Sequence, residues 1–259
     1  MAASNNTKNP IVAFTLDFET GGLKCQTSAC TQIAIHATRL DTFEKIGSYV
    51  AYIHPYYVKA IGANAKKRKN LVSKYEDESK TLMDYETKAL EYSAITMDML
   101  YDNGKPIQQV GEEIIQFIKD KTSSTPRNMK PFIIGQNIGF DEGFLCQLLE
   151  YCDLMGELKK LVRGHEDFYG NWHPLTLDTI ILGQLSLCHL SNIDSYKLEL
   201  MCENLGVELD DAHDADADVS ATTNVVAVLT QRMRSVSGEF DGESLAISKA
   251  EKTRKHFKI

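Results

Sequence analysis

The alternation of apolar and polar residues predicts a chain of mixed strands and helices. An apolar run at 11–16 and two β-rich stretches at 32–38 and 48–54 are expected to form three strands of an antiparallel meander. After Pro106, apolar residues recur at helical spacing, and a proline in the first turn costs no hydrogen bond. A short buried strand is then predicted at 132–134.

Helical patterns account for most of the second half of the chain. A helix is expected soon after Gly135, and the apolar stretch 175–187 is predicted to be helical in its second half. A short helix is expected to stop at Gly206. The last long helix begins near Asp214 and has a predicted apolar register of Ala215, Val219, Thr222, Val226, Leu229 and Met233.

The composition is that of a globular protein with one large domain. The chain has 259 residues, of which 43% are hydrophobic and 25% charged, which is enough to build a full core. Its formal net charge of -8 argues against binding nucleic acid by bulk charge, so such a partner would need a local basic surface or metal ions. Six cysteines are too sparse for a disulfide scaffold and are expected to be packed thiols.

The composition also divides the chain into segments. Residues 1–10 are polar and expected to be flexible, a domain is expected over 11–234, and the basic tail 235–259 is expected to be mobile. Residues 55–92 form a charged, helical-looking insertion, whose lysines and arginine suit either phosphate contacts or a solvated face. Residues 1–10 do not resemble a signal peptide and no apolar stretch is long enough for a membrane span, so a cytoplasmic protein without a membrane partner is expected.

The first strand carries the most informative chemistry, in Asp17 and Glu19. Side chains two residues apart on a strand share a face, so these carboxylates are expected to point into the same pocket. Two carboxylates held close together cannot both stay ionised unless a cation neutralises them. The pair therefore predicts a metal site.

Two further acidic segments follow. Asp141 lies in the turn-rich segment 135–141 after the predicted buried strand and, taken alone, is a favourable residue for a helix start. The segment 210–218 places five aspartates around His213 where the last helix begins. A solvated acidic helix start explains most of these aspartates but explains His213 and Asp218 poorly.

Two other metal motifs share features with this acidic segment. A calcium loop needs glycine after its third acid and glutamate at its twelfth position, where this chain has Val219 and Val225. The pair His213-Asp214 also resembles the dyad of helical metal phosphohydrolases. That interpretation leaves the acids on the first strand without a role.

The order of the three acidic segments resembles that of a known family. Asp-x-Glu on a first strand, Asp at a central helix start and His-x-x-x-x-Asp on a last helix resemble the DEDDh exonucleases, which are ribonuclease H-like and include the proofreading subunit of the bacterial replicative polymerase and ribonuclease T. The resemblance runs from about Ile11 to Met233, through DFETGGL, IIGQNIGFDEGFL and AHDADADVSAT. Gln32-Ile33-Ala34 and Leu177-Asp178-Thr179 are weaker matches.

The resemblance implies an α/β fold with a ribonuclease H-like mixed sheet and helices on both faces. It implies a 3′–5′ exonuclease that hydrolyses phosphodiester bonds at the 3′ end of DNA or RNA and releases nucleoside 5′-monophosphates. Two Mg²⁺ or Mn²⁺ ions are expected, because hard cations prefer oxygen ligands. The expected ligands are Asp17, Glu19, Asp141 and Asp218, and the expected general base is His213.

The resemblance also suggests contacts with the substrate. The backbone around Thr20 and Gly21 is expected to receive the terminal 3′-hydroxyl and Leu23 to pack against the last base, while Asn137 and Phe140 help to position the strand end.

The chain departs from the family pattern at 93–96, where it has Ser-Ala-Ile-Thr in place of a His-Gly-Ile-Thr-like segment. Recognition of the 3′ end is therefore expected to differ. The alternative hypothesis is a non-catalytic module on the same fold that binds nucleic acid or a polymerase, and a homodimer is a further candidate partner.

Overall fold

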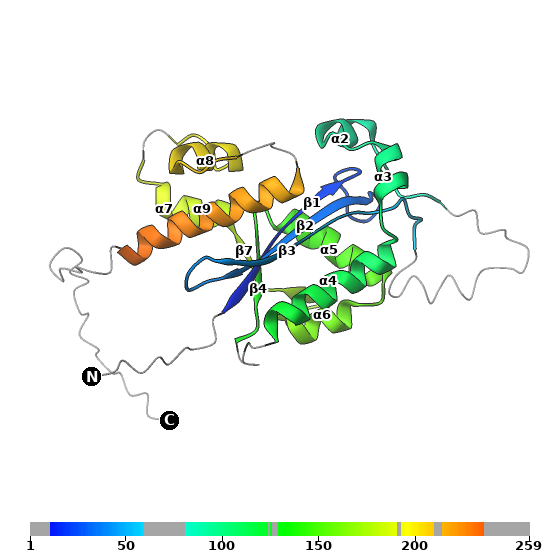
Figure 1. The fold of residues 1–259 in the computed structure, drawn as a ribbon, viewed down its shortest axis with the longest axis horizontal. Coiled ribbons are helices and arrows are strands. Elements are labelled where there is room, and N and C mark those ends of the chain that lie inside the picture. The colour runs from blue at the N-terminus through cyan, green and yellow to red at the C-terminus, as the bar shows by residue number, and fades with distance from the viewer. Residues whose placement is uncertain are drawn as a thin grey trace, which may run out of the picture.

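The computed structural model describes residues 11–59, 81–123, 125, 129–190, 193–209 and 214–235. A five-stranded sheet lies at its centre, in the order β3-β2-β1-β4-β7 (Figure 1). The first three strands form the expected antiparallel meander, and β4 and β7 run parallel to β1. The strands are β1 Val12–Thr20, β2 Cys30–Arg39, β3 Lys45–Tyr52, β4 Phe132–Gly135 and β7 Thr176–Asp178.

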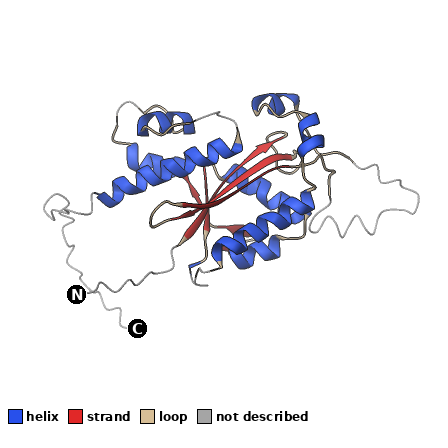
Figure 2. Ribbon diagram, viewed as in Figure 1, coloured by secondary structure: helices blue, strands red, loops and turns tan. Residues whose placement is uncertain are grey.

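Helices cover both faces of this sheet (Figure 2). One face packs against α4 Ile107–Thr122, α5 Gly139–Tyr151 and α6 Met155–Leu161. The other face packs against α7 Thr179–Leu187, α8 Leu198–Leu205 and α9 Ala215–Ser235. The remaining elements are α2 Thr87–Tyr92, α3 Met97–Asn103, and a hairpin of β5 Gly164–Glu166 and β6 Trp172–Pro174.

The two-residue period of β1 divides its side chains between the two cores. Phe14, Leu16 and Phe18 are buried in the core that contains α4 and α5. Ala13 belongs to the core beneath α7, α8 and α9. Because alternate residues face opposite sides of a sheet, Asp17 and Glu19 lie on the α9 side.

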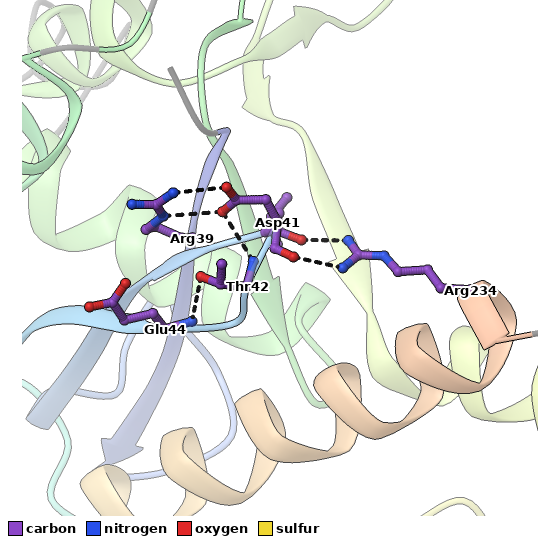
Figure 3. Close-up of polar contacts among 6 residues, drawn as sticks. Arg39, Asp41, Thr42, Glu44 and Arg234 are labelled. Carbon is purple, nitrogen blue, oxygen red and sulfur yellow. Dashed lines mark hydrogen bonds and ion pairs between the residues drawn. The ribbon is translucent and has the colours of Figure 1, made fainter. Parts of the chain in front are cut away.

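The C-terminal end of α9 is fixed to the turn between β2 and β3 (Figure 3). The guanidinium of Arg234 donates hydrogen bonds to the backbone carbonyls of Leu40 and Asp41 and lies 5.1 Å from the ring centre of Phe43. The carboxylate of Asp41 in turn accepts two hydrogen bonds from Arg39, at 2.8 and 3.1 Å. These contacts hold the end of the helix against the edge of the sheet.

The prediction that residues 55–92 are helical is wrong for 55–59 and 81–86, and it is right for α2. Residues 81–86 are extended, and the backbone of Asp84 donates to Thr27 O at 2.9 Å and accepts from Ala29 N at 3.1 Å. Pairing with the loop after β1 thus overrides a charged, helix-like composition. The amine of Lys59 contacts the backbone carbonyl of Tyr151 and the carboxylate of Asp153. Lys88 lies in α2, and residues 60–80, which include the basic cluster at 66–69, lie outside the described residues.

Other boundaries follow the sequence expectations with small corrections. Gly206 ends α8 with a left-handed φ of 69°, which glycine adopts at little cost. Ser235, predicted to begin the tail, is the last residue of α9, and Met233 is 51% exposed rather than part of the apolar face. The predicted flexible segments 1–10 and 236–259 lie outside the described residues. All six cysteines are free thiols, and Cys188 is exposed.

No helix in the described ranges combines the length and apolarity needed to cross a bilayer.

Truncation of a side chain in the core of α5 should destabilise the fold. Leu148 is fully buried, so Leu148→Ala is expected to lower the free energy of unfolding by about 2–5 kcal/mol through lost burial and a residual cavity. Leu185→Ala on α7, where the side chain is 77% exposed, should change it by less than about 0.5 kcal/mol. Urea denaturation followed by circular dichroism measures both, and equal losses would contradict this packing.

Candidate metal centre

Three of the predicted carboxylates converge at one end of the sheet. Asp17 and Glu19 project from β1, and Asp218 projects from the first turn of α9. One carboxylate oxygen from each lies within 4.8 Å of those from the other two, and all three residues are partly buried. This spacing allows one divalent cation to contact all three side chains.

Small side chains bring α9 close to the strands. Asp17 pairs with Ala34 in the register of β1 and β2, and Ala34 packs against Ala215 and Val219 of α9. The small side chains of Ala34 and Ala215 allow the backbones of helix and strand to approach each other closely. The helix can therefore place Asp218 beside the two acids of β1.

Asp141 approaches the same end of β1 from the opposite face of the sheet. It lies in the first turn of α5 and is 3% exposed. Its Oδ1 accepts a hydrogen bond of 2.9 Å from the backbone N–H of Phe18, between Asp17 and Glu19. The side chain thus binds a strand that lies 123 residues earlier in the chain.

Burial and neighbouring carboxylates oppose the ionisation of Asp17, Glu19 and Asp141. Burial, with the charges of Asp218 and Asp214, raises the pKa of Asp17 to about 7. Burial, with the charges of Asp17, Asp218 and Asp214, raises the pKa of Glu19 to about 8. The pKa of Asp141 is raised well above its usual range by burial and then by Asp17. A cation bound here would remove this repulsion.

The donor atoms in the cluster fit a hard cation. Among the described residues, the ligand atoms that converge here are carboxylate oxygens. Such oxygens favour Mg²⁺ or Mn²⁺, whereas zinc prefers thiolate and imidazole ligands. Of the described residues, these three form the acidic group close enough to hold an ion. His213 lies outside the described residues, directly before Asp214.

The predicted substrate contacts differ in their surroundings. Leu23 is 83% exposed, and Asn137 is exposed in a left-handed turn with a φ of 53°. The hydroxyl of Thr20 donates to Gly22 O at 2.8 Å, and both backbone groups of Gly21 are hydrogen-bonded within the protein. Phe140 is partly buried, with its ring centre 4.9 Å from that of Phe144.

Sequence reasoning missed two buried polar residues of β2. Gln32 donates to Asp214 Oδ1 at 3.0 Å, and His36 Nε2 lies 2.7 Å from Asp216 Oδ1. Gln32 enters the sequence prediction only as part of a family-like triplet. The sequence did carry a signal: Gln and His lie four residues apart, on one face of a mostly buried strand, which indicates polar contacts on that face.

A third missed residue is Asp178, at the end of β7. Its Oδ1 accepts from Ile180 N at 2.9 Å, which caps α7, and from Asn137 N at 3.1 Å. It therefore ties the turn before α5 to the neighbouring strand.

A cavity among the described residues lies away from this cluster. Its volume is about 610 Å³, and it runs along α5, where Glu142, Cys146 and His173 line it. None of the four carboxylates lines this cavity.

Comparison with protein-family models and with curated protein sequences finds no match. Solved structures do match. Escherichia coli exonuclease I in complex with a dT13 oligonucleotide is similar with a TM-score of 0.59 and 18% identity, over 87% of this chain and 42% of that one. A moderately thermophilic exonuclease I from Methylocaldum szegediense gives 0.58 and 21%, over 86% of this chain and 41% of that one.

The chain shares its fold with these exonucleases. The expected ribonuclease H-like mixed sheet, with helices on both faces, is therefore confirmed. The chain spans less than half the length of the exonuclease I structures that it matches. At such low identity the similarity establishes the architecture alone.

The raised pKa values predict how metal-free stability depends on pH. The ordinary pKa values are 3.8 for Asp17 and 4.5 for Glu19, whereas in the folded protein these pKa values are raised to about 7 and about 8. Between these limits the folded state binds more protons than the unfolded chain, so stability in EDTA should fall as the pH rises from about 5 to about 8. Asp17→Asn should make this fall smaller.

Urea denaturation at pH 5 and pH 8 in EDTA measures the effect. Asp120→Asn, on an exposed side chain of α4, is the control and should retain the wild-type dependence. Parallel curves for wild type and Asp17→Asn would contradict the electrostatic interpretation.

Proposed function

We propose that the protein is a metal-dependent 3′–5′ exonuclease that hydrolyses phosphodiester bonds at the 3′ end of DNA or RNA and releases nucleoside 5′-monophosphates. The observation that carries this proposal is the convergence of Asp17, Glu19 and Asp218 on the α9 side of β1. The fold shared with exonuclease I supports it, since structures of that enzyme include complexes with dT13 and dA16 oligonucleotides.

The carboxylates suit a pair of divalent cations. Asp17, Glu19 and Asp218 would hold one Mg²⁺ or Mn²⁺, and Asp17 and Asp141 would hold a second. When bound, two such ions supply an activated water and stabilise the leaving oxygen of a phosphodiester. The acids of this chain orient that pair, and the hydrogen bond from Phe18 N fixes the carboxylate of Asp141.

His213 is the proposed general base. A neutral imidazole is suited to accept a proton from water near pH 7. The neighbouring residue in the chain, Asp214, is hydrogen-bonded to Gln32 of β2 and its charge acts on Asp17 of the acidic cluster. His213 would accept the proton of the attacking water, which is the contribution that hydrolysis requires in addition to the metal-binding carboxylates.

The end of the substrate strand is proposed to lie over the turn after β1. The exposure of Leu23 and Asn137 makes both side chains accessible to a terminal nucleotide. Thr20 and Gly21 lie in the turn that presents Leu23, and Phe140, which packs against the core beneath α4 and α5, is proposed to help position the strand end. Polymerase binding, proofreading and dimer formation remain predictions from the sequence.

Removal of a metal ligand should abolish hydrolysis. We expect wild type to shorten a 5′-labelled single strand in Mg²⁺ or Mn²⁺ and to stop in EDTA. Asp17→Asn should lower the rate at least ~100-fold, since changes even to groups behind metal ligands cost about 10–100-fold. His213→Ala should lower it by a similar or larger factor, as expected for a general base.

Matched controls and substrates complete this experiment. Asp120→Asn makes the same charge change on the exposed surface of α4 and should retain wild-type activity. Side-by-side digestion of DNA and RNA of one sequence, as single strands and blunt duplexes, identifies the substrate. Binding of these strands without release of mononucleotides would overturn the proposal in favour of the non-catalytic module.

A further inference from the structure

The face of β2 beneath α9 carries an alternating set of side chains. Gln32, Ala34 and His36 are each 3% exposed or less and lie on the side of the sheet that faces α9. In the register with β1, Gln32 is opposite Glu19 and Ala34 is opposite Asp17. Gln32 and Ala34, which contact α9, are therefore the direct cross-strand neighbours of the acids on β1.

Both polar atoms of the Gln32 amide contact the beginning of α9. Its Nε2 donates to Asp214 Oδ1 at 3.0 Å, and its Oε1 accepts from the backbone N–H of Ala215 at 3.4 Å. These partners lie 182 and 183 residues away in the sequence. A buried amide with both ends engaged specifies one position for its partners, because any shift leaves a buried polar atom unsatisfied.

The anchored residue connects directly to the acidic cluster. Asp218 N donates to Asp214 O at 3.0 Å, so the two residues are joined by one helical turn. A displacement of Asp214 is carried along this rigid turn to Asp218. His36 and Asp216, at 2.7 Å, make a second contact between the same strand and the same turn.

The chemistry of an amide suits this position. A lysine or arginine at 32 would also bind Asp214, but its positive charge would lie beside the acids and oppose the binding of a cation. A glutamate would face Asp214 with a second carboxylate. The neutral amide can donate to Asp214 and accept from Ala215 while it leaves the charge of the cluster unchanged.

We propose that Gln32 is a positioning residue that acts through Asp214 to place the carboxylate of Asp218 at the distance from Asp17 and Glu19 that a divalent cation requires. The inference rests on the proposed function, because it takes the three acids as metal ligands. It extends that function by assigning a role to a residue that contacts neither metal nor substrate.

Mn²⁺ binding to the full chain without nucleic acid tests the proposal. Gln32→Leu keeps a similar volume but removes both hydrogen bonds, and it should weaken Mn²⁺ binding about tenfold by electron paramagnetic resonance titration. The double variant Gln32→Glu/Asp214→Asn exchanges donor and acceptor at unchanged total charge. It should restore affinity to within about threefold of wild type, because the amide introduced at position 214 can donate to the carboxylate introduced at position 32, and the N–H of Ala215 keeps its acceptor.

The opposite end of α9 provides a matched control. Arg234→Ala removes the contacts of Arg234 with Leu40 and Asp41 and should lower the melting temperature while Mn²⁺ affinity stays within about twofold of wild type. If Gln32→Leu does not fold, the comparison between Gln32→Glu and the double variant decides. Weaker binding by Gln32→Glu, recovered in the double variant, supports the proposal, and no recovery overturns it.

Failure of this inference is distinguishable from failure of the proposed function. Unchanged Mn²⁺ affinity in folded Gln32→Leu, with binding still abolished by Asp17→Asn, overturns the positioning role alone. Wild type that neither binds Mn²⁺ nor degrades any strand overturns the proposed function.

Discussion

The packing of α9 across β1 and β2 is the contact on which the acidic cluster depends. β1 by itself supplies two carboxylates, Asp17 and Glu19, and the third comes from a helix about two hundred residues later in the chain. The close approach at Ala34 makes this convergence possible, because a larger side chain there would separate helix and strand. Tertiary packing therefore completes the cluster that the first strand begins.

The cluster is electrostatically unfavourable as the protein folds without a cation. Burial and repulsion by neighbouring carboxylates raise the pKa values of Asp17, Glu19 and Asp141, so the folded state keeps protons at pH values where the unfolded chain has already lost them. The apolar cores on both sides of β1 offset this cost. Such local destabilisation is typical of functional sites, where groups are placed for chemistry at the expense of stability.

Features that depend on local periodicity could be predicted from the sequence, whereas those that depend on distant partners could not. The two-residue repeat of a strand placed Asp17 and Glu19 on one face, and only the family-like order of motifs joined Asp218 to them. Residues 81–86 looked helical but are extended, because their backbone pairs with the loop after β1. Gln32 looked like one more residue of a strand, since its partners lie 182 and 183 residues away. The composition of a segment indicates its intrinsic preference for helix or strand, but these contacts depend on which distant segments the fold places next to it.

The contact of Arg234 with the turn between β2 and β3 has a consequence for how that turn can vary. The guanidinium binds the carbonyl oxygens of Leu40 and Asp41, which every amino acid possesses, and not their side chains. The guanidinium therefore recognises the path of the backbone, whereas the carboxylate of Asp41 helps to shape that path through its hydrogen bonds from Arg39 and from Thr42 N. A substitution at Leu40 that keeps the shape of the turn leaves this contact available, whereas lysine is no equivalent substitute for Arg234, because it lacks the planar fork that reaches two carbonyls at once.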